Sequence, residues 1–171
     1  MQPLQPSEPT ASRTRRTIRL LLALFAAGLL ISGLTALPLV WGARLLLALA
    51  GPGTLLGDAL PALSAWLATV GAGIAAADAH YPFLFYGTDW LAFGHVVIAL
   101  AFIGPLRDPW RNRWVVEWGI LACVLVVPWA LLFGPLRGIP FFWQVIDTSF
   151  GFGGLVLLLP AYWLIRREAN S

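Results

Sequence analysis

Asp147 is a carboxylic acid inside an apolar stretch that ends only at Arg166. Insertion scales put the cost of such a residue at the centre of a membrane span at about 2.5–3.5 kcal/mol, so it usually has a partner or a task. On a helix, Gln144, Asp147, Gly151 and Gly154 share one face, because their spacings are three, four and three residues. This stripe predicts an acid between residues small enough for a second helix to approach closely.

His95 is the second candidate for chemistry inside the membrane. If the second span begins near Thr88 on the outer side, His95 lies roughly 10 Å deep, and Asp147, counted from Phe141, lies about 9 Å deep. The two side chains could then meet, and Asp147 would accept from His95 Nδ1–H and leave Nε2 for a proton, a substrate or a metal. Gln144 would add an amide at the mouth. The alternative is a structural clamp that holds two helices in register.

A further polar layer is expected nearer the outer surface. Asp89 lies near the start of the second span, where a carboxylate can cap the free N–H groups of the helix. Arg137 lies in the outer turn between the third and fourth spans. Two interpretations stay open, an Asp89–Arg137 ion pair or an anion-binding position above the inner pair. Aromatic residues also gather on this side, as they do at headgroup depth, and an aromatic-lined pocket is the functional alternative. They are Tyr81, Phe83, Phe85, Tyr86 and Trp90.

The composition identifies the elements that must position these residues. Of 171 residues, 59% are hydrophobic and 11% are charged, and the mean hydropathy is +0.80. Soluble domains carry roughly 25% charged residues, so the chain belongs to the integral membrane class and forms one domain. All basic residues are arginines scattered at the ends of apolar runs, which fits a topology signal and excludes nucleic acid as a partner.

Uncharged runs of near-spanning length predict four membrane helices in a single membrane domain over residues 13–168. The predicted spans are residues 18–41, 88–106, 114–136 and 141–165, and residues 1–12 are expected to be a disordered tail. Residues 58–80 are also apolar, but their large side chains fall on one helical face and their small ones on the other. We interpret this segment as an outer amphipathic helix with Asp58 as its N-cap. The large residues are Leu60, Leu63, Trp66, Leu67, Val70 and Ile74.

The arginines favour this topology over a five-span arrangement. With the N-terminus inside, nine arginines are cytoplasmic and only Arg44 and Arg137 are outside. A membrane crossing by residues 60–77 would move Arg107, Arg111 and Arg113 outside and weaken the bias. The predicted fold is therefore all-α, a four-transmembrane-helix bundle with an additional outer amphipathic helix. It would lie in the inner (plasma) membrane with both termini cytoplasmic.

The loop between the second and third predicted spans is basic and aromatic. Arg113 and Glu117 are four residues apart and are expected to pair on the third helix. The three arginines and two tryptophans of this loop also suit the headgroups of anionic lipids at the inner interface. The candidates for such contacts are Arg107, Trp110, Arg111, Arg113 and Trp114.

No pattern in the sequence indicates a metal or a cofactor. Cys123 is the single cysteine, so it has no partner for a disulfide or a CxxC site. Haem held by two intramembrane histidines is disfavoured because His80 lies in the outer segment. We therefore expect neither a metal nor a cofactor.

Three short motifs between Tyr81 and Gly151 carry a resemblance. They are Tyr86–Trp90, Gly104–Pro109 and Gly138–Trp143 together with Ile146 and Asp147. With these residues the chain resembles a family of small bacterial four-span membrane proteins that has no established activity. The resemblance implies the membrane class and the region of interest, and it carries over no functional residue.

Two functions fit these observations. The first is a non-enzymatic accessory subunit, or a binder of a small ligand or lipid, built around Asp147, His95 and Gln144. The second is a membrane enzyme or proton-coupled carrier that uses Asp147 and His95 as an acid–base pair. The sequence leaves enzymatic activity open and favours the first. The expected partners are the lipid bilayer and either another membrane protein or a second copy of the chain.

Overall fold

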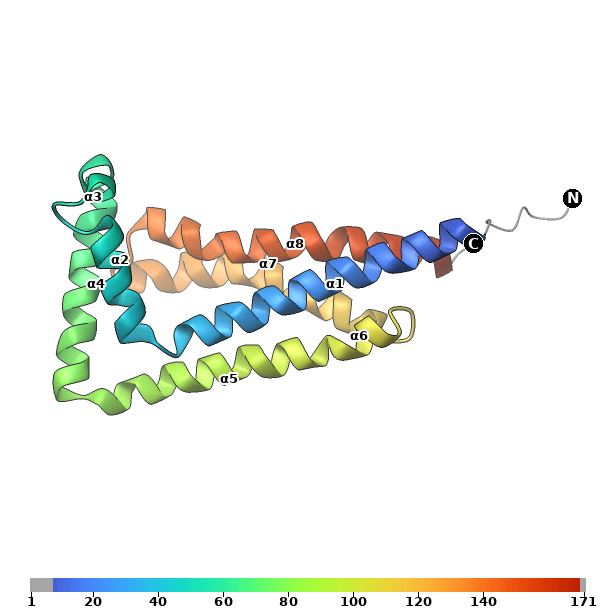
Figure 1. The fold of residues 1–171 in the computed structure, drawn as a ribbon, viewed down its shortest axis with the longest axis horizontal. Coiled ribbons are helices and arrows are strands. Elements are labelled where there is room, and N and C mark those ends of the chain that lie inside the picture. Colours follow the sequence, from blue (N-terminus) through green and yellow to red (C-terminus); the bar gives the residue numbers. More distant parts are fainter. Residues whose placement is uncertain (1–7, 170–171) are drawn as a thin grey trace, which may run out of the picture. The chain divides into compact units, whose positions relative to one another are not determined.

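The computed structural model of the 171-residue chain describes residues 8–169, and its regular structure in that range is entirely helical (Figure 1). Helices are expected in apolar sequence because a helix satisfies its own backbone N–H and C=O groups. The elements are α1 (Glu8–Ala36), α2 (Leu39–Ala50), α3 (Leu55–Ala59), α4 (Pro61–His80), the 3-10 helix η1 (Pro82–Phe85), α5 (Tyr86–Ala101), α6 (Ile103–Arg107), α7 (Arg113–Leu136) and α8 (Phe141–Ala169).

The chain forms two compact units. Of the described residues, 8–28 and 98–169 belong to unit 1, which contains the first part of α1, the end of α5, and α6, α7 and α8. Residues 29–97 form unit 2, with the rest of α1, α2 to η1, and most of α5. Each unit has its own packing.

In unit 1, α7 and α8 run antiparallel and side by side (Figure 1). A Cβ added at Gly151 would lie 2.6 Å from the Cys123 carbonyl oxygen, and one added at Gly154 would meet the Cys123 sulfur. The absence of side chains at the two glycines therefore allows the helices to approach closely. Buried residues recur along α8 every three or four positions, as a packed helix face requires. They are Gln144, Thr148, Gly151, Gly154, Leu158, Ala161 and Ile165.

The turn between α7 and α8 is defined by its backbone. Gly138 has φ +68°, a left-handed conformation that favours glycine. Its N–H donates to the carbonyl of Pro135 (3.1 Å), and the N–H of Ile139 donates to the carbonyl of Gly134 (2.9 Å). These two bonds form a Schellman motif, which satisfies the last carbonyls of α7 and fixes the direction in which α8 begins.

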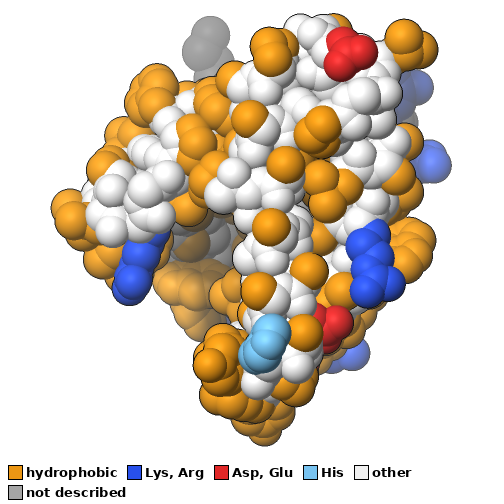
Figure 2. Space-filling view, turned by 90° about the vertical axis from the view of Figure 1, so that its left-hand side faces the viewer, with side chains coloured by type: hydrophobic (Ala, Val, Ile, Leu, Met, Phe, Trp, Pro, Cys, Tyr) orange, Lys and Arg blue, Asp and Glu red, His pale blue; other side chains and the backbone are white. Residues whose placement is uncertain are grey.

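In unit 2, α2 packs along α4, and Leu47 of α2 fills the space that a side chain at Gly71 would occupy. The turn before α3 is closed by Thr54, whose hydroxyl donates to the Gly51 carbonyl (2.8 Å) and accepts from the Gly57 N–H (3.0 Å). Figure 2 shows the side of the molecule where α2, α3 and α4 lie, with many apolar side chains on its surface and few charged ones.

The predicted division of α4 into a large and a small face is confirmed only in part, because on the small face Ser64 is 5% exposed and Ala68 and Gly71 are half-buried. Leu60 of the large face is exposed, which differs from the expectation. Ala65, Thr69 and Ala72 of the small face are exposed as expected. The large residues Leu63, Trp66, Leu67, Val70 and Ile74 are buried or half-buried.

Within residues 8–169, five helical segments are long and apolar enough to cross a membrane, and α4 is one of them. The membrane class is thus supported by the helices themselves. The α4 segment has a spanning length of 20 residues, so length and composition do not separate it from a span. The other four segments are 12–36, 82–107, 113–136 and 141–169.

Several boundaries differ from the expectations. The helix expected over residues 18–41 ends at Ala36, and α2 begins at Leu39, because Pro38 cannot continue the hydrogen bonding of α1. Asp58 does not cap α4, which begins at Pro61; it lies inside α3, whose N-cap is Thr54. The helix α1 begins at Glu8, inside the segment expected as a tail, and residues 1–7 lie outside the described residues.

Candidate functional site

Gln144 closes the turn between α7 and α8. Its side chain is only 4% exposed, and Nε2 donates to the carbonyl oxygen of Ile139 (2.8 Å). It also packs against Gly134, where an added Cβ would lie 2.6 Å from Gln144 Cγ. The position that the sequence suggested as an amide at the mouth of a site is therefore a structural clamp on the turn.

Asp147, one turn further along α8, has different surroundings. The hydroxyl groups of its two neighbours are hydrogen-bonded within α8. Thr148 Oγ1 donates to the Val145 carbonyl (2.8 Å) and Ser149 Oγ donates to the Ile146 carbonyl (2.6 Å). Asp147 is half-buried, and within the described part of unit 1 its carboxylate has no hydrogen-bond or ion-pair partner. It is Thr148, and not Asp147, that lies in the buried seam of α8.

His95 belongs to unit 2, where it is half-buried on α5. Its Nδ1 lies 2.9 Å from the carbonyl oxygen of Leu91. Because a carbonyl only accepts, Nδ1 carries the proton and Nε2 of the neutral ring is an acceptor. Leu91, and not Asp147 as the sequence suggested, therefore fixes the tautomer. Since Asp147 is in unit 1, the meeting of the two side chains stays a prediction.

A close helix contact surrounds His95 within unit 2. A Cβ added at Gly33 of α1 would lie 2.6 Å from His95 Cβ and 3.0 Å from the Ala92 carbonyl oxygen. Gly33 is buried in this contact. The sequence does not single out this glycine, because nothing in the apolar run of α1 distinguishes it from the exposed Gly28.

The outer candidates lie at the ends of their helices. Asp89 is in the first turn of α5, as predicted, and is exposed. It shares a shallow surface depression with Tyr86, Trp90 and Phe93, whose rings meet edge to face at centroid distances of 5.9 and 5.6 Å. Arg137 is the exposed C-cap residue of α7 in unit 1. The Asp89–Arg137 ion pair therefore also stays a prediction.

The predicted pair of Arg113 and Glu117 is confirmed, with Nε 3.1 Å from Oε1. The structure adds Tyr162 of α8, whose hydroxyl donates to the same Glu117 oxygen (2.9 Å). The guanidinium of Arg166 lies over the Tyr162 ring, 5.8 Å from its centroid. These contacts join α7 to the last turns of α8, and Arg113 uses its Nε on Glu117 while its side chain stays 46% exposed.

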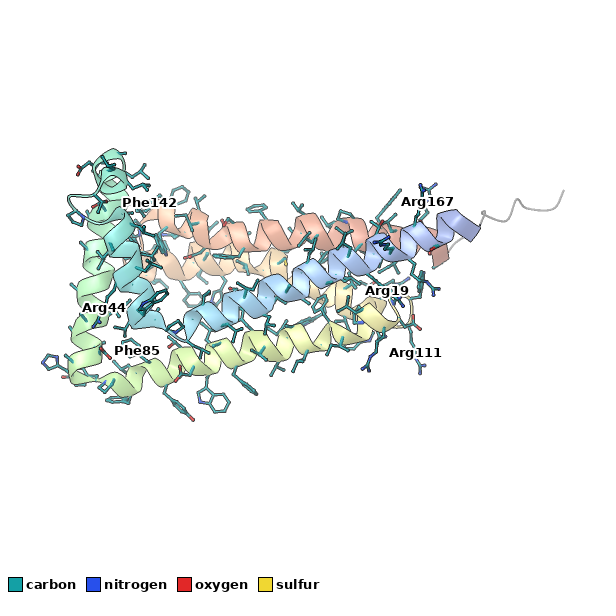
Figure 3. All side chains as sticks on the ribbon, in the orientation of Figure 1. Arg19, Arg44, Phe85, Arg111, Phe142 and Arg167 are labelled. Carbon is teal, nitrogen blue, oxygen red and sulfur yellow. The ribbon has the colours of Figure 1, made fainter. Side chains whose placement is uncertain are left out.

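Arginines of α1 reach the end of α6 and the loop that follows it. The Arg15 guanidinium lies over the Trp110 ring at 4.8 Å, and Arg19 Nη2 donates to the Arg107 carbonyl (3.1 Å). Figure 3 shows Arg19, Arg111 and Arg167 at one end of unit 1 and Phe142 at the other. The sequence named the loop but not its α1 partners, although its topology placed both groups of arginines on one side.

The loop itself is held by side chains of its own. Asp108 Oδ1 accepts from the Arg111 N–H (3.0 Å). Asn112 Nδ2 donates to the carbonyls of Gly104 (3.1 Å) and Asp108 (3.0 Å), and Pro109 is fully buried. Trp114, at the start of α7, is 65% exposed. The loop therefore presents Trp110 and its arginines from a defined backbone.

Among residues 8–169, no three His, Cys, Asp or Glu side chains are placed so that they could hold a metal ion. Comparison of the chain with known protein families, with curated proteins and with solved structures finds no match.

Proposed function

We propose that the protein is an integral inner-membrane protein that binds rather than catalyses, with Asp147 as its recognition group. It would serve as an accessory subunit, or bind a small ligand or lipid. The fold would be a four-span bundle with α4 as an outer amphipathic helix and both termini in the cytoplasm. The spans are α1, the segment from α5 to α6, α7 and α8.

The hydrogen bond from Arg19 to the Arg107 carbonyl supports four spans. It brings the start of α1 and the end of α6 to the same end of unit 1, as the Arg15–Trp110 contact also does. If only α1 and the segment from α5 to α6 cross the membrane between these points, both ends return to one side. A third crossing by α4 would put them on opposite sides. The excess of arginines makes that side the cytoplasm.

The observation that carries the binding role is the unpaired carboxylate of Asp147. The side chains of Gln144, Thr148 and Ser149 donate to backbone carbonyls of their own turn or helix, so they have structural tasks. Among the residues of unit 1 that the structure describes, the Asp147 carboxylate has no such hydrogen bond. A carboxylate held in a span without a partner favours any cationic or hydrogen-bond-donating group that reaches it. We expect that group to come from the ligand or the partner subunit.

Native mass spectrometry of the protein in mild detergent tests this role. The wild type is compared with Asp147→Asn, and with Asp78→Asn as a control that removes an exposed carboxylate from α4. We expect a small adduct or an additional polypeptide on the wild type and on the control, and its loss from Asp147→Asn. The mass distinguishes a ligand from a partner.

Stability provides the second measurement. Because an unpaired charge in a span is unfavourable, Asp147→Asn should leave the melting temperature unchanged or raise it. A structural clamp predicts a lower melting temperature instead. The proposal fails if Asp147→Asn keeps every adduct, or if its main effect is to destabilise the bundle.

A further inference from the structure

The arginine-rich end of unit 1 carries more positive charge than its acids neutralise. Arg113 is paired with Glu117 in this part of the structure. Arg15, Arg19 and Arg107 have no acidic partner there, although Arg15 and Arg19 each make a contact that orients the side chain.

Those contacts leave most of each guanidinium free. Arg15 contacts Trp110 through the ring face, with its guanidinium carbon 4.8 Å from the ring centroid, and this cation–π contact uses none of its N–H donors as a hydrogen bond. Arg19 uses one donor on the Arg107 carbonyl and retains the others. Two oriented guanidinium groups from successive turns of α1 suit a tetrahedral anion with several oxygens, such as a phosphate diester.

We propose that Arg15, Arg19 and Trp110 form a binding site for the phosphate headgroup of an anionic phospholipid. Trp110 orients Arg15, the Arg107 carbonyl orients Arg19, and the two guanidinium groups bind the phosphate oxygens. The rigid loop closed by Asp108 and Asn112 holds Trp110 in place. The proposal rests on the membrane topology proposed above, which puts this end in the cytoplasmic leaflet.

A lipid is favoured over free phosphate by the apolar side chains that follow on the same helices. Leu20 and Leu24 of α1 are 58% and 51% exposed, and Ile103 of α6 is 39% exposed. They lie on the membrane side of Arg19 and Arg107 in sequence, where acyl chains would run. An anionic headgroup near the surface gains further attraction from each additional arginine.

Native mass spectrometry with added lipid tests the site. The full-length protein is titrated with phosphatidylglycerol, with phosphatidylcholine and with inorganic phosphate. We expect the wild type to retain phosphatidylglycerol, and Arg15→Gln to retain it about tenfold less, as loss of a charge-assisted contact implies. Trp110→Leu should also lower retention, although it removes no charge. Arg167→Gln is the matched control, because Arg167 stacks on Trp163 at the same end of the unit (5.4 Å).

Arg15→Lys separates a built site from general attraction to charge. Lysine keeps the charge but lacks the planar fork, so the site predicts retention close to that of Arg15→Gln. Retention equal to the wild type in Arg15→Lys and Trp110→Leu, or an equal loss in Arg167→Gln, would overturn the site. Binding of inorganic phosphate as strong as that of phosphatidylglycerol would overturn the proposal that the ligand is a lipid. Circular dichroism checks that each variant is folded, and cysteine labelling tests the topology independently.

Discussion

Gln144 and Asp147 lie one turn apart on α8, and their surroundings give them opposite roles. The amide is buried and bonded to the turn, whereas the acid is half-buried and has no partner in the described part of unit 1. From the sequence both were candidates for a polar site, because each is a polar residue within an apolar run. What separates them is the Schellman turn, which brings the Ile139 carbonyl to the Gln144 amide. Asp147 therefore remains the candidate for binding.

Gln144→Leu and Gln144→Glu test the clamp. Leucine has a similar size but no donor, so loss of the bond to Ile139 should lower the free energy of unfolding by about 1–2 kcal/mol. Glutamate must either bury a charge beside the Ile139 carbonyl or take up a proton, and either cost should destabilise the protein further. Thermal unfolding in detergent ranks the stabilities of the wild type and the two variants. Ser149→Ala serves as a control at an exposed position of α8. A Gln144→Glu variant as stable as the wild type would show that the amide does not hold the turn.

At the scale of the helices, the apolar runs predicted α7 and α8 closely, because their flanking residues mark both ends. The break between α1 and α2 was missed, since hydropathy continues through Pro38 while the backbone does not. The sequence also did not show whether Asp147 or Thr148 belongs to the buried face of α8. At about 100° per residue, both lie within about 60° of Gln144 around the helix axis, so only the placement of α7 decides.

The contact between α7 and α8 offers a matched pair of glycine substitutions. A Cβ at Gly154 would meet the Cys123 sulfur and would lie 3.0 Å from Phe25 Cε2, whereas one at the neighbouring Gly153 has nothing within 4 Å. We expect Gly154→Ala to cost about 1–3 kcal/mol by overpacking. Gly153→Ala should be neutral or stabilising, because alanine favours a helix over glycine by about 1 kcal/mol.

The double variant Gly154→Ala with Cys123→Ala identifies the cause. Removal of the sulfur makes room for the new methyl group, so the double variant should be more stable than the sum of the single changes predicts. The measurement is thermal unfolding of the four proteins of the cycle in one detergent. Strict additivity, or equal losses in Gly153→Ala and Gly154→Ala, would mean that the close approach at Gly154 does not determine stability.

At the scale of the whole molecule, the arginines and the helix count point to different topologies. Length and composition allow five crossings, because α4 satisfies both criteria. The contacts of Arg15 with Trp110 and of Arg19 with Arg107 at the end of α6 favour an even number of membrane crossings between the contacting segments. Hydropathy reports only whether a segment tolerates lipid, whereas a contact between distant segments constrains the sides on which they lie. The contacts therefore favour four spans over five.

Arg111 and Arg137 decide between the two topologies, because they lie at opposite ends of α7 and exchange sides if α4 crosses the membrane. Each is replaced by cysteine in a Cys123→Ala background, and intact cells are treated with a maleimide that cannot cross the membrane. With four spans, Arg137→Cys is labelled from outside and Arg111→Cys only after lysis. Both native residues are exposed, so burial does not limit the reaction.

With five spans the labelling pattern reverses. Ser12→Cys, which is cytoplasmic in both arrangements, controls for leakage of the reagent into the cells. If Arg111→Cys reacts in intact cells and Arg137→Cys does not, α4 is a transmembrane helix and the Arg19–Arg107 contact cannot form in the membrane.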